Sequence, residues 1–311
     1  MNATALPIFF APLQGYTEAI YRNAHATVFG GVDTYYTPFV RLEKGNFRNK
    51  DLRDIDPAQN RVPHLVPQLI GAQKDKIEKI LGQFIERNYK EADINMGCPF
   101  PLLAKRCNGS GILPFPEEVD KIMDVVRQHP EIRFSIKMRL GWEDPGECIR
   151  LLPILNELPL THITLHPRLG KQQYKGETDL ESFRAFAEDC RHPLIYNGDI
   201  KTLEDIEQIQ NRLPSLAGIM IGRGLLANPA LALEYKEGRV LSSEEMKEKL
   251  FTLHKLVFKD YDAQIQGGES QLLNKMKVFW EYLEPQIGHK AWKTIHKSTS
   301  LAKYQAAIGT I

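Results

Sequence analysis

Short apolar segments alternate with amphipathic segments along most of the chain, and this alternation restricts the possible folds more than any other feature. Segments such as 74–87, 117–127, 179–189 and 203–210 carry apolar residues at helical spacing. Strands that alternate with helices predict an α/β fold with a parallel sheet, and eight such units close most simply into a (β/α)8 TIM barrel. The eight expected strands are 8–10, 34–37, 64–69, 92–95, 134–138, 162–165, 194–196 and 218–221.

Polar or glycine-rich residues follow these strands, as a barrel requires. The carboxyl ends of all eight strands meet at one face of a barrel, and barrel enzymes carry their chemistry there. A doubly wound sheet is the alternative, but it would gather ligand-binding residues at a single switch point. Because the polar residues here follow every strand, we favour the barrel.

The pattern becomes purely helical after Gly238. Ser242 and Glu245 have the spacing of a capping box, and Met246, Leu250 and Val257 lie on one face of the helix that follows. Further helices are expected over 272–283 and 289–303. We therefore divide the chain into a barrel domain, residues 1–240, and a small all-helical domain, residues 241–311.

The net charge of the 311-residue chain is only +1, so any surface for a polyanion must be local. The helical tail provides one, since its last part is rich in lysine and has only Glu281 and Glu284 as acids. Lys290, Lys293 and Lys297 fall on one helix face and could track phosphates, or could simply form a solvated basic face. The tail lysines are Lys275, Lys277, Lys290, Lys293, Lys297 and Lys303.

The four cysteines form no C-x-x-C pair, so neither a zinc site nor an iron–sulfur cluster is predicted. Few, scattered cysteines favour a reducing compartment. Met1–Leu13 lacks the features of an export signal, and no segment has 18 uninterrupted apolar residues. We expect a cytoplasmic protein that binds no metal, spans no membrane and is a monomer.

Two glycine-containing loops follow the last two expected strands. Asn197-Gly198-Asp199 and Gly222-Arg223-Gly224 occupy the positions where phosphate-binding barrels present backbone N–H groups. Arg223 adds a cation. Taken alone, each loop is an ordinary turn; their joint position favours a phosphate site.

Polar side chains at other strand ends suit the rest of a cofactor. Lys137 and Arg139 alternate along one strand, so both are expected to face the barrel mouth, where two cations favour an anionic ligand. Gln68 and His166 can hydrogen-bond a heteroaromatic ring or a phosphate. The alternative is that each is a solvated or internally satisfied structural residue.

The sharpest local motif is Asn95-Met96-Gly97-Cys98-Pro99, a rigid turn that presents a thiol after a strand. Cys98 is the catalytic candidate. Its alternative role is that of a small buried apolar residue, and for Cys107, Cys148 and Cys190 we prefer that role or chemical inertness.

Several motifs together resemble the tRNA-dihydrouridine synthases, in order and at plausible spacing from Ala11 to Pro229. Thr37–Leu42 and the basic helical tail are most similar to the bacterial synthase C branch. The motifs are A-P-L-Q-G, P-Q-L, D-I-N-M-G-C-P, N-G-S-G-I-L, S-I-K-M-R-L-G-W, T-L-H-P-R, Y-N-G-D-I and I-G-R-G-L-L-A-N-P.

The resemblance implies FMN as cofactor, reduced by NADPH or NADH, and a hydride transferred from reduced FMN to C6 of a uridine in tRNA. Cys98 would supply the proton at C5 as general acid. Asn95, Arg139 and Tyr174 would contact the uracil. The implied FMN-binding residues are Ala11, Pro12, Leu13, Gln68, Lys137, His166, Asn197, Gly198, Asp199, Gly222, Arg223 and Gly224.

The chain departs from the family pattern in two places. Phe100-Pro101-Leu102-Leu103 follows the cysteine turn where a lysine and a β-branched residue are usual, and Leu13 stands where methionine is commoner. The first departure bears on how a tRNA strand enters the site.

Two other functions fit parts of the pattern. A dihydroorotate dehydrogenase or ene-reductase would use the same barrel and phosphate loops on a small molecule, but it has no use for the basic tail. A non-catalytic RNA-binding barrel that retains flavin as a relic would have no use for Cys98.

Overall fold

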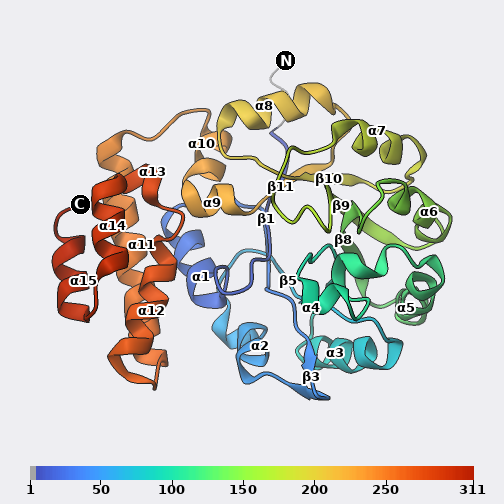
Figure 1. Ribbon diagram of the computed structural model, residues 1–311, viewed down its shortest axis with the longest axis horizontal. Helices are drawn as coiled ribbons and strands as arrows, with labels where there is room; N and C mark the ends of the chain where they lie inside the picture. The colour runs from blue at the N-terminus through green and yellow to red at the C-terminus, as the bar shows by residue number, and fades with distance from the viewer. Residues whose placement is uncertain (1–4) are drawn as a thin grey trace.

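The computed structural model describes residues 5–311 and confirms the barrel (Figure 1). All neighbouring strands of the main sheet are parallel, in the order β5-β2-β1-β11-β10-β9-β8-β7-β6. The strands are β1 (Ile8–Phe10), β2 (Thr34–Tyr36), β5 (Leu65–Val66), β6 (Gln68–Leu69), β7 (Glu91–Met96), β8 (Arg133–Gly141), β9 (Leu160–Leu169), β10 (Leu194–Asn197) and β11 (Gly218–Ile221).

The two ends of this sheet are halves of one expected strand, 64–69. Pro67 separates β5 from β6 because proline has no N–H to donate to a ladder. β5 pairs with β2, β6 pairs with β7, and the Asp93 N–H still bonds the Pro67 carbonyl at 3.0 Å. The sheet therefore closes into the expected eight-stranded ring.

Amphipathic helices cover the outside of the ring, as predicted. On α3, Ile77, Ile80, Leu81 and Phe84 are buried at helical spacing, and each contributes roughly 1.5–3 kcal/mol by leaving water. The covering helices are α1 (Ala19–Val28), α3 (Lys74–Glu86), α5 (Pro116–Gln128), α6 (Gly146–Leu155), α7 (Leu180–Asp189), α8 (Leu203–Arg212) and α10 (Leu231–Glu237).

The inside of the ring is polar along three strands. On β7 the side chains of Ala92, Ile94 and Met96 join the apolar core, while those of Asp93 and Asn95 alternate with them and are also buried. The pattern repeats on the next strands with Ser135, Lys137 and Arg139, and with Thr164, His166 and Arg168. Buried polar groups need hydrogen-bond partners. The partners of these side chains extend toward the barrel mouth.

The sequence pattern does not predict several short elements. The hairpin β3 (Leu42–Glu43) and β4 (Asn46–Phe47) turns at Lys44 and Gly45, which both have positive φ. A Lys-Gly turn lacks the usual Asn-Gly or Asp-Gly signal of this hairpin type. The remaining short elements are α2 (Asn49–Asp54), η1 (Pro57–Gln59), α4 (Pro101–Ala104), η2 (Gly109–Ile112) and α9 (Arg223–Ala227).

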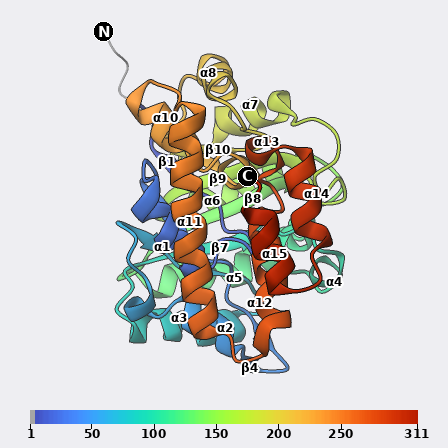
Figure 2. The ribbon, with the colours of Figure 1, turned by 90° about the vertical axis from the view of Figure 1, so that its left-hand side faces the viewer.

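The tail is helical throughout, and Figure 2 shows its helices side by side. The capping box of Ser242 and Glu245 is confirmed. The single helix expected over 289–303 is wrong, because Ser298 adopts an extended backbone and Ser300 caps a new helix. The tail helices are α11 (Ser243–Gln264), α12 (Gly268–Trp280), α13 (Glu284–Ile287), α14 (His289–Lys297) and α15 (Leu301–Ile308).

The tail packs against α1 and is joined to the barrel by polar contacts (Figures 1 and 2). The Glu18 carboxylate accepts hydrogen bonds from the Tyr261 hydroxyl at 3.0 Å and the Lys275 ammonium at 2.7 Å. Lys249 donates to the Val28 carbonyl at 2.9 Å. The tail is thereby held against the β1–α1 side of the barrel mouth.

Within residues 5–311, every helix is either too short or too polar to cross a membrane. The expectation that Met1–Leu13 is no export signal falls partly on residues 1–4, which lie outside the described chain.

Candidate active site

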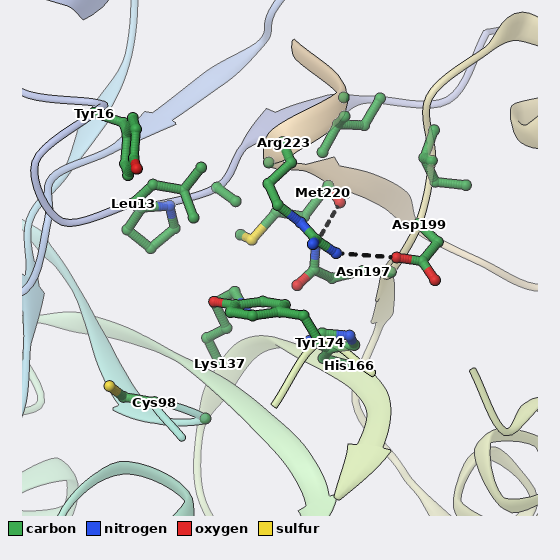
Figure 3. A pocket seen from close by; sticks show the side chains of 18 of the residues that line it. Leu13, Tyr16, Cys98, Lys137, His166, Tyr174, Asn197, Asp199, Met220 and Arg223 are labelled. Carbon is green, nitrogen blue, oxygen red and sulfur yellow. Dashed lines mark hydrogen bonds and ion pairs between the residues drawn. The ribbon is translucent and has the colours of Figure 1, made fainter. Parts of the chain in front are cut away.

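A cavity of about 310 Å³ opens at the carboxyl ends of the strands (Figure 3). Its walls bring together most of the side chains that the sequence nominates from separate loops. The nominated residues that line it are Ala11, Pro12, Leu13, Asn95, Cys98, Lys137, Arg139, His166, Tyr174, Asn197, Gly198, Asp199, Gly222, Arg223 and Gly224.

The turn that carries Cys98 is held from both sides. The Asn95 Oδ1 accepts from the N–H groups of Gly97 at 3.1 Å and Cys98 at 2.9 Å. Ser110 donates its N–H and its hydroxyl to the Cys98 carbonyl, both at 3.0 Å. Gly109 has a φ of +59°, and a Cβ there would lie 2.5 Å from the Cys98 carbonyl oxygen. The N-G-S-G segment therefore supports the cysteine turn.

The Cys98 thiol is suited to hold a proton. Burial raises its pKa above the ordinary value, while the nearby positive charges of Arg139 and Lys137 oppose the shift without cancelling it. The thiol is therefore protonated at neutral pH. Cys107, Cys148 and Cys190 are free thiols that do not line this cavity.

Gln68 lies beneath the cavity wall. Its side chain is fully buried, its Nε2 donates to Asp93 Oδ2 at 2.6 Å, and its Oε1 accepts from the Asn95 Nδ2 at 2.8 Å. Each amide end of Gln68 thus has a protein partner.

Lys137, from β8, faces the cavity (Figure 3). Burial and the positive charge of Arg139 together lower the pKa of its ammonium to about 8, against the attraction of Asp93 and Cys98. The ion pairs of the cavity wall join Asp199 to Arg168 and Arg223 and do not involve Lys137.

Two arginines, Arg139 and Arg223, hold the part of the cavity wall that contains Tyr174. Arg139 is buried and donates through Nε to the Gly97 carbonyl at 3.0 Å and through Nη1 to the Leu169 carbonyl at 2.8 Å. The Tyr174 ring makes cation–π contacts with two guanidinium groups, 5.4 Å from that of Arg139 and 4.4 Å from that of Arg223. Cation–π contacts of this kind hold an exposed ring in place.

His166 lies among these cations. Burial lowers the pKa of its imidazole well below the ordinary value, and the positive charges of Arg139, Lys137 and Arg168 lower it further. The ring is neutral at physiological pH and can both donate and accept a hydrogen bond.

The two glycine loops lie against each other. A Cβ on Gly224 would lie 2.0 Å from the Ile200 carbonyl oxygen, so only glycine allows this approach. Asn197 donates to the Met220 carbonyl at 2.8 Å, which ties β10 to β11, and Arg223 pairs with Asp199 at 3.1 Å (Figure 3). One end of the cavity is therefore built from backbone and a cation.

The sequence missed other lining residues. Tyr16, from the loop after β1, packs edge to face on Tyr282, which follows α12 of the tail, with ring centroids 5.3 Å apart. Both rings line the cavity. Nothing in the local sequence marks Tyr282, because its position depends on how the tail packs on the barrel. The other missed lining residues include Gln14, Phe39 and Lys201.

The tail lysines lie elsewhere. Lys290, Lys293 and Lys297 are exposed on α14 and do not line the cavity. The Trp292 ring packs on His296, with ring centroids 4.2 Å apart. No cluster of three or more His, Cys, Asp and Glu side chains in the described part of the chain is arranged to hold a metal ion.

Known structures share the barrel. Morphinone reductase superposes with a TM-score of 0.51 at 14% identity, covering 77% of this chain and 88% of that one. A variant of NCR from Zymomonas mobilis gives 0.50 at 15% identity, covering 76% and 87%. At these identities the likeness concerns the fold alone.

Curated relatives are more similar in sequence. tRNA-dihydrouridine synthase B of Pasteurella multocida is 27% identical over 231 residues, 72% of this chain and 67% of that protein. tRNA-dihydrouridine(16) synthase of Neisseria meningitidis is 27% identical over 239 residues, 74% and 71%. These equal identities do not single out a branch, so the C branch stays a prediction.

The family model of the dihydrouridine synthases (Dus) matches residues 9–307, which includes both the barrel and the helical tail. The chain is therefore an enzyme of the dihydrouridine synthase family.

Proposed function

We propose that the protein reduces the C5=C6 bond of a uridine in tRNA to 5,6-dihydrouridine, with FMN as cofactor and NADPH or NADH as reductant. The observation that carries the proposal is the placement of the Cys98 thiol, whose pKa burial raises, in a cavity that Lys137 and Arg139 also line. Family membership and the tRNA named in the relatives' descriptions support the substrate.

The residues of the cavity fit FMN. The loops of Asn197–Asp199 and Gly222–Gly224 offer backbone N–H groups and the Arg223 cation to a phosphate. Lys137, which has no part in the ion pairs of the wall, would lie near the polar edge of the ring, since a cation there stabilises the reduced form. FMN, when bound and reduced, supplies the hydride for C6.

The remaining cofactor contacts follow from position. Ala11–Leu13 form the wall next to Gly222. A Cβ added to Gly222 would lie 3.3 Å from the Cβ of Ala11. Neutral His166 offers a hydrogen bond to the same ligand. Gln68 would support this ligand from behind the wall, because its Oε1 accepts from Asn95, which lines the cavity.

Cys98 acts as the general acid in this proposal. A thiol whose pKa is raised keeps its proton at neutral pH and can give it to C5 as the carbon accepts negative charge. Arg139 and Lys137 then stabilise the thiolate that remains, because both are cations close to the sulfur.

The uracil would lie between Cys98 and Tyr174. Arg139 binds two carbonyls through Nε and Nη1, which leaves Nη2 for an oxygen of the base. Asn95 keeps one Nδ2 hydrogen for the same purpose. The target nucleotide must leave its stack to enter, at a cost of about a few kcal/mol that is smallest in a loop.

The tail would bind the rest of the tRNA. Lys290, Lys293 and Lys297 present three exposed cations on one face of α14, and residues 241–311 form the tRNA-binding domain beside the FMN-binding barrel of residues 1–240. A monomeric state and a cytoplasmic location complete the proposal.

The test is incubation of unmodified tRNA with the purified protein, FMN and NADPH, followed by nucleoside mass spectrometry. We expect a gain of about two mass units on uridine, the mass of one hydride and one proton. Reduction of free pyrimidines or enones with unmodified tRNA left intact would instead establish a small-molecule reductase.

A further inference from the structure

A buried carboxylate below the cavity has no part in the proposed chemistry. Asp93 is fully buried on β7 and does not line the cavity. It is held by Ser135, whose hydroxyl donates to Asp93 Oδ1 at 2.6 Å from the neighbouring strand. A buried carboxylate is costly, so its retention inside the barrel needs a reason.

Asp93 begins a chain of hydrogen bonds that ends at the cysteine turn. Gln68 donates to Asp93 Oδ2 at 2.6 Å, and Asn95 donates to Gln68 Oε1 at 2.8 Å. Asn95 Oδ1 then accepts from the N–H groups of Gly97 and Cys98. Three side chains thus connect the barrel interior to the backbone of Cys98.

The donors and acceptors at the two ends of this hydrogen-bond chain fix the orientation of the Gln68 and Asn95 amides. An ionised carboxylate only accepts hydrogen bonds, and backbone N–H groups only donate them. Gln68 must therefore point its Nε2 toward Asp93, which leaves its oxygen for Asn95. Asn95 in turn keeps its oxygen for Gly97 and Cys98. Reversing either amide would place a donor against a donor or an acceptor against an acceptor.

We propose that Asp93 is a positioning residue: its carboxylate, acting through Gln68 and Asn95, fixes the Gly97–Cys98 backbone and so directs the Cys98 thiol into the cavity. The inference rests on the proposed role of Cys98 in uridine reduction. Asp93 itself touches neither the cavity nor the thiol.

The charge state of Asp93 supports this role. Burial raises the pKa of its carboxyl to about 6, while hydrogen bonds from Ser135 and Gln68 and the positive charge of Lys137 oppose the shift. The negative charge of Asp93 also acts on Tyr36, and the pKa of that phenol is raised well above the ordinary value by burial and by this charge. Asp93 is therefore an acceptor at neutral pH.

The test uses isosteric variants of the full-length holoenzyme. Asp93→Leu keeps the shape but removes the acceptor, so Gln68 loses its anchor. Asp93→Asn is the conservative variant, because its amide nitrogen can donate to Ser135 while its oxygen still accepts from Gln68. Ser135→Ala is the matched control, since it removes the other hydrogen bond of Asp93 and leaves the chain to Cys98 intact.

The first measurement is hydrogen exchange at Gly97 and Cys98, followed by mass spectrometry. We expect exchange to be about tenfold faster in Asp93→Leu and within about threefold of the parent in Asp93→Asn and Ser135→Ala. The tRNA-dependent oxidation of reduced flavin should slow about tenfold or more in Asp93→Leu alone, with flavin content and reduction by NADPH unchanged.

Asn95→Ala serves as a second variant that cuts the last link and leaves Asp93 and Ser135 in place. It should match Asp93→Leu in exchange, and the double variant should exchange no faster than either single one, because both act on one chain. Unchanged exchange in Asn95→Ala would overturn the proposal even if Asp93→Leu did not fold.

Parent-like exchange in Asp93→Leu, or equal damage in Asp93→Asn and Asp93→Leu, would also overturn it. If the parent protein reduces no tRNA, the proposed function fails, while the exchange measurement still decides the role of Asp93.

Discussion

Cations outnumber carboxylates at the cavity, and this imbalance shapes the properties of single residues there. Arg168 and Arg223 share the carboxylate of Asp199. Lys137 and Arg139 have no such partner in the wall, and burial lowers the pKa of both side chains, that of Lys137 to about 8 and that of Arg139 to about 10. An anionic ligand would supply the missing charge.

Alkylation of Cys98 should report its raised pKa. Iodoacetamide reacts with the thiolate, so at pH 8 Cys98 should react more slowly than a cysteine in an unfolded peptide, and its rate should still be rising with pH where the rate of the peptide cysteine has levelled off. Peptide mass spectrometry separates Cys98 from Cys107, Cys148 and Cys190. A rate at Cys98 that reaches its plateau below pH 8 would mean a thiolate at neutral pH and would exclude the role of acid.

The raised pKa of Asp93 also predicts how the stability of the folded protein depends on pH. Its pKa is raised from 3.8 to about 6 in the folded protein, so the ionised carboxylate destabilises the fold above pH 6 by something on the order of 3 kcal/mol. As pH falls from 6 toward 4, the folded protein takes up the proton first and the cost disappears.

Asp93→Asn should therefore raise the melting temperature at pH 7, with Ser135 and Gln68 still satisfied, and the gain should vanish near pH 4. Thermal unfolding followed by circular dichroism at both values measures this. A variant less stable than the parent at pH 7 would show that the charge of Asp93 stabilises the fold.

At the scale of elements, the strands and covering helices could be predicted because periodicity in the sequence is local. The pattern predicts the third strand whole, although Pro67 divides it. The break at Ser298 has no clear signal because serine is not a strong helix breaker, and its hydroxyl bonds the Thr294 carbonyl instead of marking an end.

The residues of the cavity could be predicted where each strand ends, since the barrel brings strand ends together. Tyr16 and Tyr282 could not, because their contact joins segments far apart in the sequence. The buried position of Gln68 could not be predicted either. It depends on Asp93, which the sequence shows only as a polar residue in a strand, and on Asn95, for which the family resemblance implies a different role, contact with the uracil.

The support of the cysteine turn can be tested with a pair of glycines. Gly109→Ala should destabilise the protein by about 2 kcal/mol or more, since φ is +59° and the Cβ would meet the Cys98 carbonyl. Gly82→Ala is the control: Gly82 lies inside α3 with open space around a Cβ, so alanine should stabilise the protein by about 0.5–1 kcal/mol. Urea unfolding measures both, and equal effects would contradict the role of Gly109.

At the scale of the whole molecule, the tail does two things at once. Through Tyr282 it forms part of the cavity wall, and through α14 it presents an exposed basic face outside the cavity. The contacts of Glu18 with Tyr261 and Lys275 hold these parts in one orientation.

The basic face predicts a salt dependence of tRNA binding. Changing Lys290, Lys293 and Lys297 to Gln should weaken binding and lower the slope of log Kd against log salt by about one for each phosphate that the variant no longer neutralises. The same change at three lysines of α3, Lys74, Lys76 and Lys79, alters net charge equally and should leave the slope unchanged. Equal losses of affinity in both triple variants would mean that net charge, and not the face of α14, binds tRNA.

The central claim is that Cys98 donates the proton in a flavin-dependent reduction of tRNA uridine, and the most direct test is the rate at which unmodified tRNA oxidises the pre-reduced holoenzyme without oxygen. Removing a general acid costs about 10²–10⁴ in rate, so Cys98→Ala should oxidise at least a hundredfold more slowly, while its reduction by NADPH and the Cys107→Ala control stay at parent rates. Oxidation of Cys98→Ala by tRNA at the parent rate would contradict the account.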